Sequence, residues 1–228
     1  MKKTMSDFGR FKHYNDLLLI HIFFALVCIP TSGKMIDVLG TPLSVSIFYF
    51  PFIYIVADLL TEVYGYAAAR RVVWYGVIAQ VATTLIFTFV SWYPPAASFT
   101  HNEAYQSVLS TAPQLVLFGT IAVFLGDISN NYVLARMKVW TQGRAQGLRF
   151  VTSTVVGQGV NTAFFYTFGL WGLLSSSFLM HSIALASVAK ILVEVVMLPV
   201  TIRIAAWLKN REMVDVFDTE TDFNPLKF

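Results

Sequence analysis

The sequence predicts an all-α, polytopic membrane protein with six transmembrane helices and both termini in the cytoplasm. Its 228 residues are 56% hydrophobic and only 13% charged, whereas soluble domains carry about 25% charged residues. Several apolar stretches reach the roughly 20 residues that a helix needs to cross the hydrocarbon core of a bilayer. Lysine and arginine are also distributed unevenly between the connecting segments, which indicates the direction of each crossing.

Six apolar segments are long enough to be spanning helices. They cover approximately residues 15–33, 44–65, 71–93, 113–136, 150–174 and 181–207. The basic N-terminus imitates a signal peptide, but the following CIPTSGKM lacks a small-residue cleavage site, so we retain the first segment as a helix. We expect one six-helix transmembrane domain, residues 1–208, followed by an acidic cytoplasmic tail, residues 209–228. We expect this tail to be solvated and mobile.

Basic residues gather at four places: before the first span, after the second, after the fourth and after the sixth. They are Lys2, Lys3, Arg10, Lys12, Arg70, Arg71, Arg136, Lys138, Arg144, Arg149, Lys209 and Arg211. The only lysine or arginine in the loops on the opposite side is Lys34. Because positively charged loops stay in the cytoplasm, both termini should lie there. The net charge of +3 then reports topology and does not indicate binding of a nucleic acid.

Ionisable residues inside the predicted spans mark candidate functional sites, because lipid disfavours charge. They are Asp58, Glu62, Asp127, Lys190 and Glu194. The fourth span adds the neighbouring amides of Asn130 and Asn131, and the fifth adds Gln158, Asn161 and Thr162. Counted at 1.5 Å per residue, most of these groups lie about 10–20 Å from the cytoplasmic ends of their helices. We therefore expect a single polar cavity between the helices.

Several of these residues also have a purely structural interpretation. Lys190 and Glu194 are four residues apart on one helix face and could form an ion pair. Glu62 falls near the inner boundary and could be an interfacial acid close to Arg70 and Arg71.

For the amides near the centre of the spans a structural role is an alternative, whereas for the acids a functional role is favoured. Gln158 and Asn161 could simply join helices by hydrogen bonds. Asp58 and Asp127 have no nearby cation in their own helices, which favours a functional role. We expect no role for the isolated His21.

The sequence contains none of the common catalytic or metal-binding motifs. It has no P-loop, no H-E-x-x-H, no G-x-S-x-G and no cysteine–histidine cluster. We therefore expect no catalytic residues, no metal site and no cofactor. Acids in a cavity can still perform acid–base chemistry, so a non-transport intramembrane enzyme remains an alternative.

Three parts of the sequence resemble the queuosine precursor transporter family, also called vitamin-uptake-transporter-like. They are YFPFIYIVADLLTEVYGYAAARR, LGDISNNYVLARMKVWTQG, and STVVGQGVNTAFF with the later VAKILVEVVMLPV. The resemblance extends over residues 15–208. It implies a six-helix bacterial inner-membrane protein that takes up 7-deazaguanine precursors of the tRNA nucleoside queuosine, of the preQ0, preQ1 or queuine type. Asp127 stands where many members are expected to have Glu, and Asn161 where Asp is expected, so the preferred substrate could differ.

A 7-deazaguanine fits the chemistry of the predicted polar layer. One carboxylate can accept hydrogen bonds from the N1–H and the 2-amino group together. The aromatic side chains that could stack on the base are those of Phe48, Tyr49, Phe52, Phe164 and Phe165. The candidate substrate-binding residues are Asp58, Glu62, Asp127, Asn131, Gln158, Asn161, Lys190 and Glu194.

The expected partners are a nucleobase-like small molecule and the lipid bilayer, without nucleic acid; a homodimer is left open. A second function also stays open beside the enzyme alternative. The chain could be the substrate-binding subunit of a multi-component vitamin importer that is driven by a separate ATPase.

Overall fold

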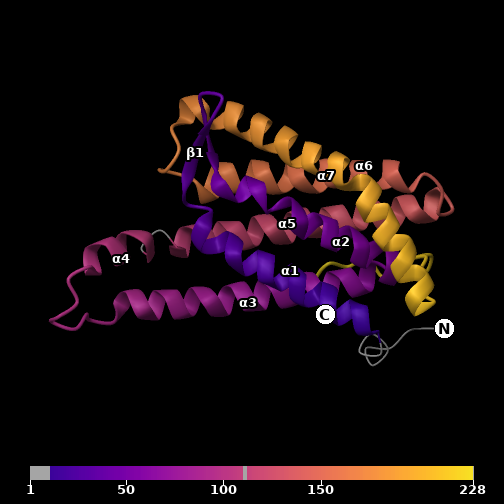
Figure 1. Ribbon diagram of the computed structural model, residues 1–228, viewed down its shortest axis with the longest axis horizontal. Helices are drawn as coiled ribbons and strands as arrows, with labels where there is room; N and C mark the ends of the chain where they lie inside the picture. The colour runs from indigo at the N-terminus through magenta and orange to yellow at the C-terminus, as the bar shows by residue number, and fades with distance from the viewer. Residues whose placement is uncertain (1–10, 110–111, 228) are drawn as a thin grey trace.

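The computed structural model describes residues 11–109 and 112–227. Five long helices run along the molecule (Figure 1): α1 (Lys12–Thr31), α3 (Tyr66–Trp92), α5 (Ala112–Trp140), α6 (Gln146–Phe164) and α7 (Ser176–Glu212). The central helix α5 packs against both α3 and α6. The last turn of α6 continues as a π-helix over Phe165–Gly169.

The molecule is predominantly helical, which agrees with the predicted all-α membrane fold. Within the described residues, three helical segments are long and apolar enough to cross a membrane: Tyr66–Trp92, Asn102–Trp140 and Ser177–Glu212. The second of them includes the short helix α4 (Asn102–Leu109). The count of six spans stays a prediction.

The predicted span 44–65 is wrong in its first part. The strands β1 (Met35–Val38) and β2 (Thr41–Ser44) form an antiparallel hairpin. Both residues of its turn have positive φ angles, as in a type I′ hairpin. After the 3₁₀ turn Val45–Phe48, helix α2 begins at Pro51, a residue that favours the first turn because it has no N–H to satisfy.

Helix α2 (Pro51–Tyr64) has 14 residues, which makes it roughly 21 Å long at 1.5 Å per residue. This is less than the ~30 Å hydrocarbon thickness. The hairpin continues the chain beyond the start of α2 and packs into the bundle. The side chain of Leu43 is fully buried, and Ser182 of α7 donates a hydrogen bond of 2.9 Å to the carbonyl of Pro42.

The loop predicted at Arg70 and Arg71 does not exist. Only Gly65 separates α2 from α3, so both arginines lie in the first turns of α3. Gly65 has a φ of +87°, and an added Cβ would lie 2.7 Å from Val216 Cγ1. A glycine therefore permits both the sharp turn and the close approach of the C-terminal segment.

Residues 213–227 of the predicted tail pack across one end of the bundle, while most of their side chains stay exposed, which agrees with a solvated segment; its mobility stays a prediction. The Val216 amide donates to a carbonyl at the end of α2 over 3.2 Å. The buried carboxylate of Asp218 accepts from the Tyr66 amide over 3.0 Å. Arg70 donates to two tail carbonyls, each at 2.8 Å. Helix α7 (Ser176–Glu212) extends beyond both ends of the predicted span 181–207.

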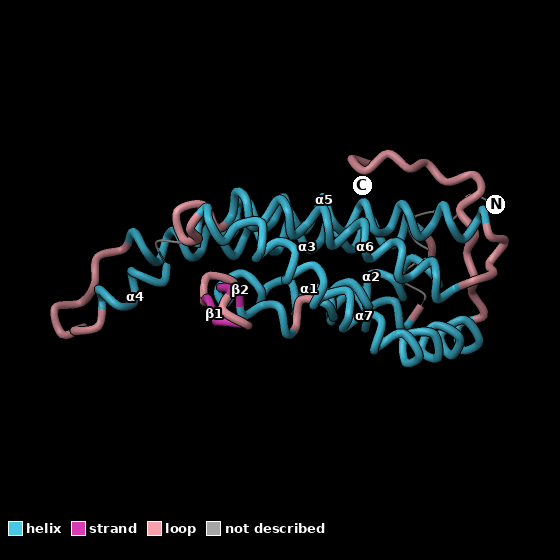
Figure 2. Tube along the Cα trace, turned by 90° about the horizontal axis from the view of Figure 1, so that it is seen from above, coloured by secondary structure: helices cyan, strands magenta, loops and turns pink. Residues whose placement is uncertain are grey.

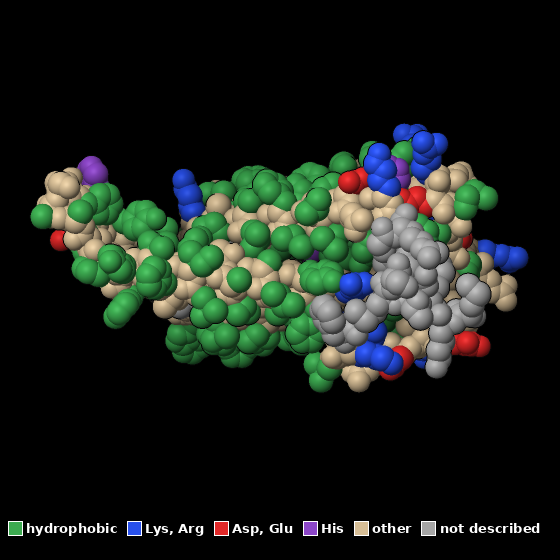
Figure 3. Space-filling view, turned by 90° about the horizontal axis from the view of Figure 1, so that it is seen from below, with side chains coloured by type: hydrophobic (Ala, Val, Ile, Leu, Met, Phe, Trp, Pro, Cys, Tyr) green, Lys and Arg blue, Asp and Glu red, His purple; other side chains and the backbone are tan. Residues whose placement is uncertain are grey.

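The start of α1 and the end of α7 meet at this same end, which we call the inner end. The amide of His13 donates to the Glu212 carboxylate over 2.7 Å. Figure 2 shows the hairpin and α4 toward the opposite end. In Figure 3 most blue and red side chains gather at the inner end, while apolar side chains cover the rest of that face. Lys2, Lys3 and Arg10 lie outside the described residues, and the cytoplasmic location of the inner end stays a prediction.

Candidate functional site

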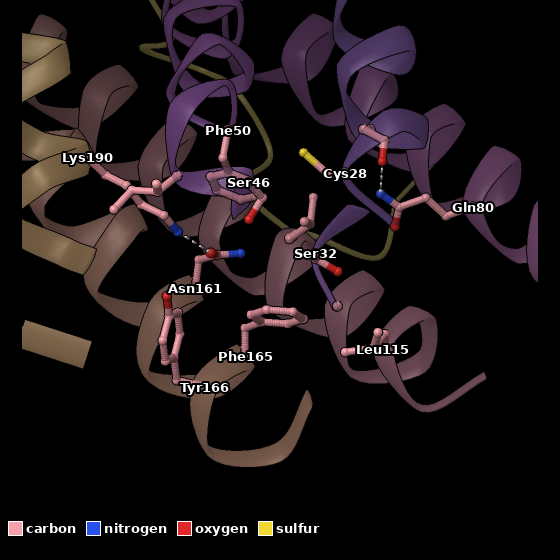
Figure 4. A pocket seen from close by; sticks show the side chains of 14 residues that line it. Cys28, Ser32, Ser46, Phe50, Gln80, Leu115, Asn161, Phe165, Tyr166 and Lys190 are labelled. Carbon is pink, nitrogen blue, oxygen red and sulfur yellow. Dashed lines mark hydrogen bonds between the residues drawn. The ribbon is translucent and has the colours of Figure 1, made fainter. Parts of the chain in front are cut away.

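A cavity lies between α1, α3, α5, α6, α7 and the segment just before α2 (Figure 4). Its volume is about 40 Å³, which is room for a few water molecules. Its polar lining residues are Cys28, Ser32, Ser46, Gln80, Asn161, Tyr166 and Lys190. The other lining residues are Ala25, Ile47, Phe50, Leu115, Gly119, Val123 and Phe165. Of the predicted substrate-binding residues, Asn161 and Lys190 line this cavity.

Lys190 reaches across the cavity from α7 toward α6. Its Nζ donates to Thr162 Oγ1 over 3.1 Å and, at 3.5 Å, points to Asn161 Oδ1. The same nitrogen lies 4.1 Å from the ring centroid of Phe50. The expected ion pair with Glu194 is wrong, since Lys190 has no carboxylate within 4.0 Å among the described residues. A lysine that precedes the glutamate is also the less favourable order for such a pair.

A layer of buried polar side chains lies one helical turn closer to the inner end than the cavity. On four helices a cavity-lining residue has a buried polar residue three or four positions away in that direction. The pairs are Ala25 with His21, Val123 with Asp127, Asn161 with Gln158, and Lys190 with Glu194. Residues at this spacing lie above one another on a helix. His21, Asp127, Gln158 and Glu194 therefore lie directly below the cavity. Asp58, Asn130 and Asn131 are seven or eight residues from the cavity-lining Phe50 and Val123, about one turn further toward the inner end. We call these seven residues together the polar layer.

Many polar atoms of this layer have no hydrogen-bond partner within the described part of the chain. Both carboxylate oxygens of Asp127, both of Glu194 and both side-chain amide atoms of Gln158 belong to this group. Each of these three residues is at most 2% exposed. Proteins pair about nine in ten of their buried polar groups. This concentration of donors and acceptors without a protein partner makes the layer the candidate functional site.

Asp127 faces His21 on α1. The distance between Asp127 Oδ2 and His21 Nε2 is 3.4 Å, and both side chains are almost fully buried. Next to Asp127, α5 packs closely on α6: an added Cβ on Gly126 would lie 2.8 Å from Asn161 Cβ and 2.9 Å from the carbonyl oxygen of Gly157. Nothing in the sequence singled out His21, because its partner Asp127 lies on a helix far along the chain.

Asp58 connects α2 to α5 and α7. Its Oδ1 accepts a hydrogen bond of 2.7 Å from Asn130 Nδ2, and its carboxyl group lies beside that of Glu194. Asn131 is engaged elsewhere, because its Oδ1 accepts from Thr61 Oγ1 over 3.0 Å. Asp58 therefore has one oxygen without a hydrogen bond within the described residues, whereas neither oxygen of Asp127 accepts one, although its Oδ2 lies 3.4 Å from His21 Nε2.

A family model described as a putative vitamin uptake transporter matches residues 44–204. The chain belongs to this family. The match includes the polar layer apart from His21, and it confirms the resemblance found in the sequence.

Two relatives of this vitamin uptake transporter family member carry more specific names. The "Probable queuosine precursor transporter" of Bacillus subtilis (strain 168) is 24% identical over 197 residues, which are 86% of each chain. The "Queuosine precursor transporter" of Escherichia coli (strain K12) is 26% identical over 175 residues, covering 73% of this chain and 74% of the relative. No solved structure matches the chain.

Glu62 lies outside the cavity in this family member, one turn beyond Asp58 toward the inner end. Arg149 Nη2 donates to its two carboxylate oxygens over 2.8 and 2.9 Å. Lys209 Nζ contacts Oε1 over 2.7 Å. The alternative that placed Glu62 next to Arg70 and Arg71 is wrong, because its ion-pair partners come from α6 and α7. Glu62 thus joins three helices below the polar layer.

The charged cluster around Glu62 extends into the C-terminal segment. Lys138 donates to the carbonyl of Glu62 and to the Asp215 carboxylate, and Lys209 lies 3.0 Å from the same Asp215 oxygen. Partial burial raises the pKa of Asp215, but the hydrogen bonds and charges of Lys138 and Lys209 outweigh it and hold the pKa below its ordinary value. Asp215 therefore fastens the tail to the bundle as a carboxylate.

The sequence missed several residues that line the cavity. Ser46 and Phe50 lie in the segment that was expected to be regular helix, so their position at the cavity was hidden. Gln80, at 2% exposure in α3, was visible as a polar residue within an apolar span. Of the aromatic residues proposed for stacking, Phe165 lines the cavity, whereas Phe48 is 65% exposed.

Proposed function

We propose that this protein imports 7-deazaguanine precursors of queuosine across the inner membrane of a bacterium. Both relatives are named as queuosine precursor transporters. The observation that carries the proposal is the set of unpaired carboxylate and amide atoms directly below the cavity. Buried ionisable residues in membrane proteins mark substrate pathways by default.

Asp127 is the proposed acceptor for the N1–H and 2-amino donors of the base. Both of its oxygens are buried and accept no hydrogen bond within the described residues, apart from the contact of Oδ2 with His21 Nε2 at 3.4 Å. A carboxylate that binds two donors together gives a strong, directional contact. The amide of Gln158, whose nitrogen and oxygen are both unpaired, suits the neighbouring O6. Asp58 is the nearest rival, with one oxygen already bound to Asn130.

Transport requires this site to widen. Pockets that enclose small organic ligands measure about 300–1,000 Å³, whereas the cavity has a volume of about 40 Å³. Phe165 and Lys190, which line the cavity from the π-helix after α6 and from α7, would therefore move when the base binds. Rocking of helices around a central site is the usual way in which transporters alternate access.

Ligand-induced thermal stabilisation of the purified protein tests the proposal. A ligand that binds the folded state at 100 times its Kd stabilises it by about 2.7 kcal/mol. We expect 7-cyano- and 7-aminomethyl-7-deazaguanine or queuine to raise the melting temperature, and adenine and thiamine to leave it unchanged. Stabilisation by a vitamin and by none of the deazaguanines would contradict the proposal.

Uptake experiments separate transport from the alternative functions. Cells that express only this protein should accumulate the base, whereas a substrate-binding subunit would need its ATPase partner. The base recovered inside the cell should be chemically unchanged, because a modified product would favour the enzyme.

Asp127→Asn tests the proposed contact. The amide keeps the size of the side chain but can direct a donor at the donors of the base, and a mismatch of this kind can cost about 10⁴-fold or more in affinity. Binding should collapse while the variant still elutes as a folded protein. Asp16→Asn, which changes an exposed acid in α1, is the matched control.

A base without the 2-amino group should lose less affinity on Asp127→Asn than the complete base. Equal losses for the two ligands would show that Asp127 does not bind the 2-amino group. Unchanged binding in both Asp127→Asn and Asp58→Asn would refute recognition by a carboxylate.

A further inference from the structure

Lys190 is the one basic side chain among the described residues that line the cavity. It is 4% exposed. Three other basic residues near the inner end, Lys138, Arg149 and Lys209, each pair with a carboxylate. Within the described residues Lys190 has no such partner, which leaves a donor-rich group in the cavity wall without an opposite charge.

The neighbours of the Lys190 amine are neutral. Thr162 Oγ1 accepts at 3.1 Å, Asn161 Oδ1 lies at the long distance of 3.5 Å, and Phe50 offers its ring face at 4.1 Å. An ammonium group has three N–H donors, so these contacts leave it able to bind a further acceptor. In Figure 4 the amine points toward Asn161 along the cavity wall.

The position of Lys190 relative to the polar layer determines which edge of a base it meets. In the proposed function, the 2-amino edge faces Asp127 in that layer. The cavity lies one turn further from the inner end, and C7 lies across the ring system from the 2-amino group. A substituent on C7 therefore points toward the part of the site that Lys190 lines.

We propose that Lys190 selects the substituent on C7 and favours an electron-rich acceptor, a nitrile or a carboxylate, over a positively charged aminomethyl group. A nitrile nitrogen or carboxylate oxygen accepts an N–H from Lys190, and the carboxylate also supplies the missing opposite charge. An aminomethyl group offers donors to a donor and places two cations close together. The inference rests on the proposed function and concerns a different edge of the base.

The test measures binding of four bases that differ only at C7: unsubstituted 7-deazaguanine and its nitrile, carboxylate and aminomethyl derivatives. Wild-type protein should bind the nitrile and the carboxylate more tightly than the aminomethyl base, on the order of 100-fold for a close pair of like charges. In Lys190→Met the ratio between the affinities for the nitrile and the aminomethyl base, measured on the same protein, should shrink at least tenfold. Lys34→Met removes an exposed lysine near the hairpin and should keep the wild-type order.

The ranking of the four bases on wild-type protein can overturn the inference without any variant. If Lys190→Met does not fold, Lys190→Gln serves as the second variant. An aminomethyl base that binds as tightly as the nitrile would refute selection by Lys190. An unchanged preference in the variant would also refute it while leaving the proposed function intact. Failure of all four bases to bind wild-type protein would instead reject the proposed function, and the inference with it.

Discussion

Replacing Glu62 with glutamine should destabilise the folded protein by about 3–5 kcal/mol, because the change leaves a buried guanidinium without its counter-charge. Glu62 is 1% exposed and Arg149 is fully buried. Arg149 Nη2 contacts both oxygens of the carboxylate over 2.8 and 2.9 Å. Its Nη1 donates to the carbonyl of Arg144 and to Thr141, so the guanidinium cannot leave the site without losing further hydrogen bonds.

The second cation of this cluster contributes less to the expected loss. The side chain of Lys209 is 21% exposed, so water can replace part of what Glu62 provides, and partly exposed ion pairs contribute at most about 1 kcal/mol. The larger share therefore comes from Arg149. For a domain of 150–250 residues, 1 kcal/mol shifts the melting temperature by about 2–4 °C. The expected decrease is about 6–20 °C.

Thermal unfolding of detergent-purified Glu62→Gln, Arg149→Met and the double variant tests this reasoning. The double variant should be less destabilised than the sum of the two single variants, because it no longer buries an unpaired charge. Lys227→Met, which breaks an ion pair exposed on both sides, should leave the melting temperature unchanged. A Glu62→Gln variant as stable as wild type, or strictly additive losses in the double variant, would refute the assigned pairing.

Three further predictions concern the tail, the helix packing and the topology. Asp215→Asn should lower stability at neutral pH. The difference from wild type should begin to shrink below about pH 4, the ordinary pKa of an aspartate, and vanish once the pH falls below the depressed pKa of Asp215, because the group stabilises the fold only while it is ionised. A difference that grows with acidification would contradict this. Gly126→Ala places a methyl group within 3 Å of Asn161 Cβ and should cost about 1–3 kcal/mol by overpacking, whereas Gly159→Ala meets nothing within 4 Å and should not; equal melting temperatures would argue against this packing. A reporter fused after residue 228 should be active only in its cytoplasmic form, and periplasmic activity would overturn the predicted topology.

The depth of each polar residue along its helix could be predicted from the sequence, as the polar layer shows. Each residue advances 1.5 Å along its helix axis, so counting from the basic ends brought Asp58, Asp127, Gln158 and Glu194 to a common level. Their burial agrees with that level. The family resemblance was equally readable, because it resides in contiguous segments of the second, fourth and last helices.

The partners of these residues were not readable, because the rotation and neighbours of each helix depend on packing between segments far apart in the chain. Lys190 was expected to bind Glu194 on its own helix, yet it contacts Asn161 and Thr162 on α6. An interfacial position near Arg70 and Arg71 was one alternative for Glu62, yet it binds Arg149, 87 residues away in the chain.

The sequence by itself determined the membrane class, the level of the polar layer and the family, since composition and spacing along one helix contain that information. Only the tertiary structure decided that residues 35–44 form a hairpin, that the tail packs on the inner end, and that His21 faces Asp127. These features depend on contacts between separate segments, where hydrogen bonds and opposite charges outweigh the local preferences that a sequence displays.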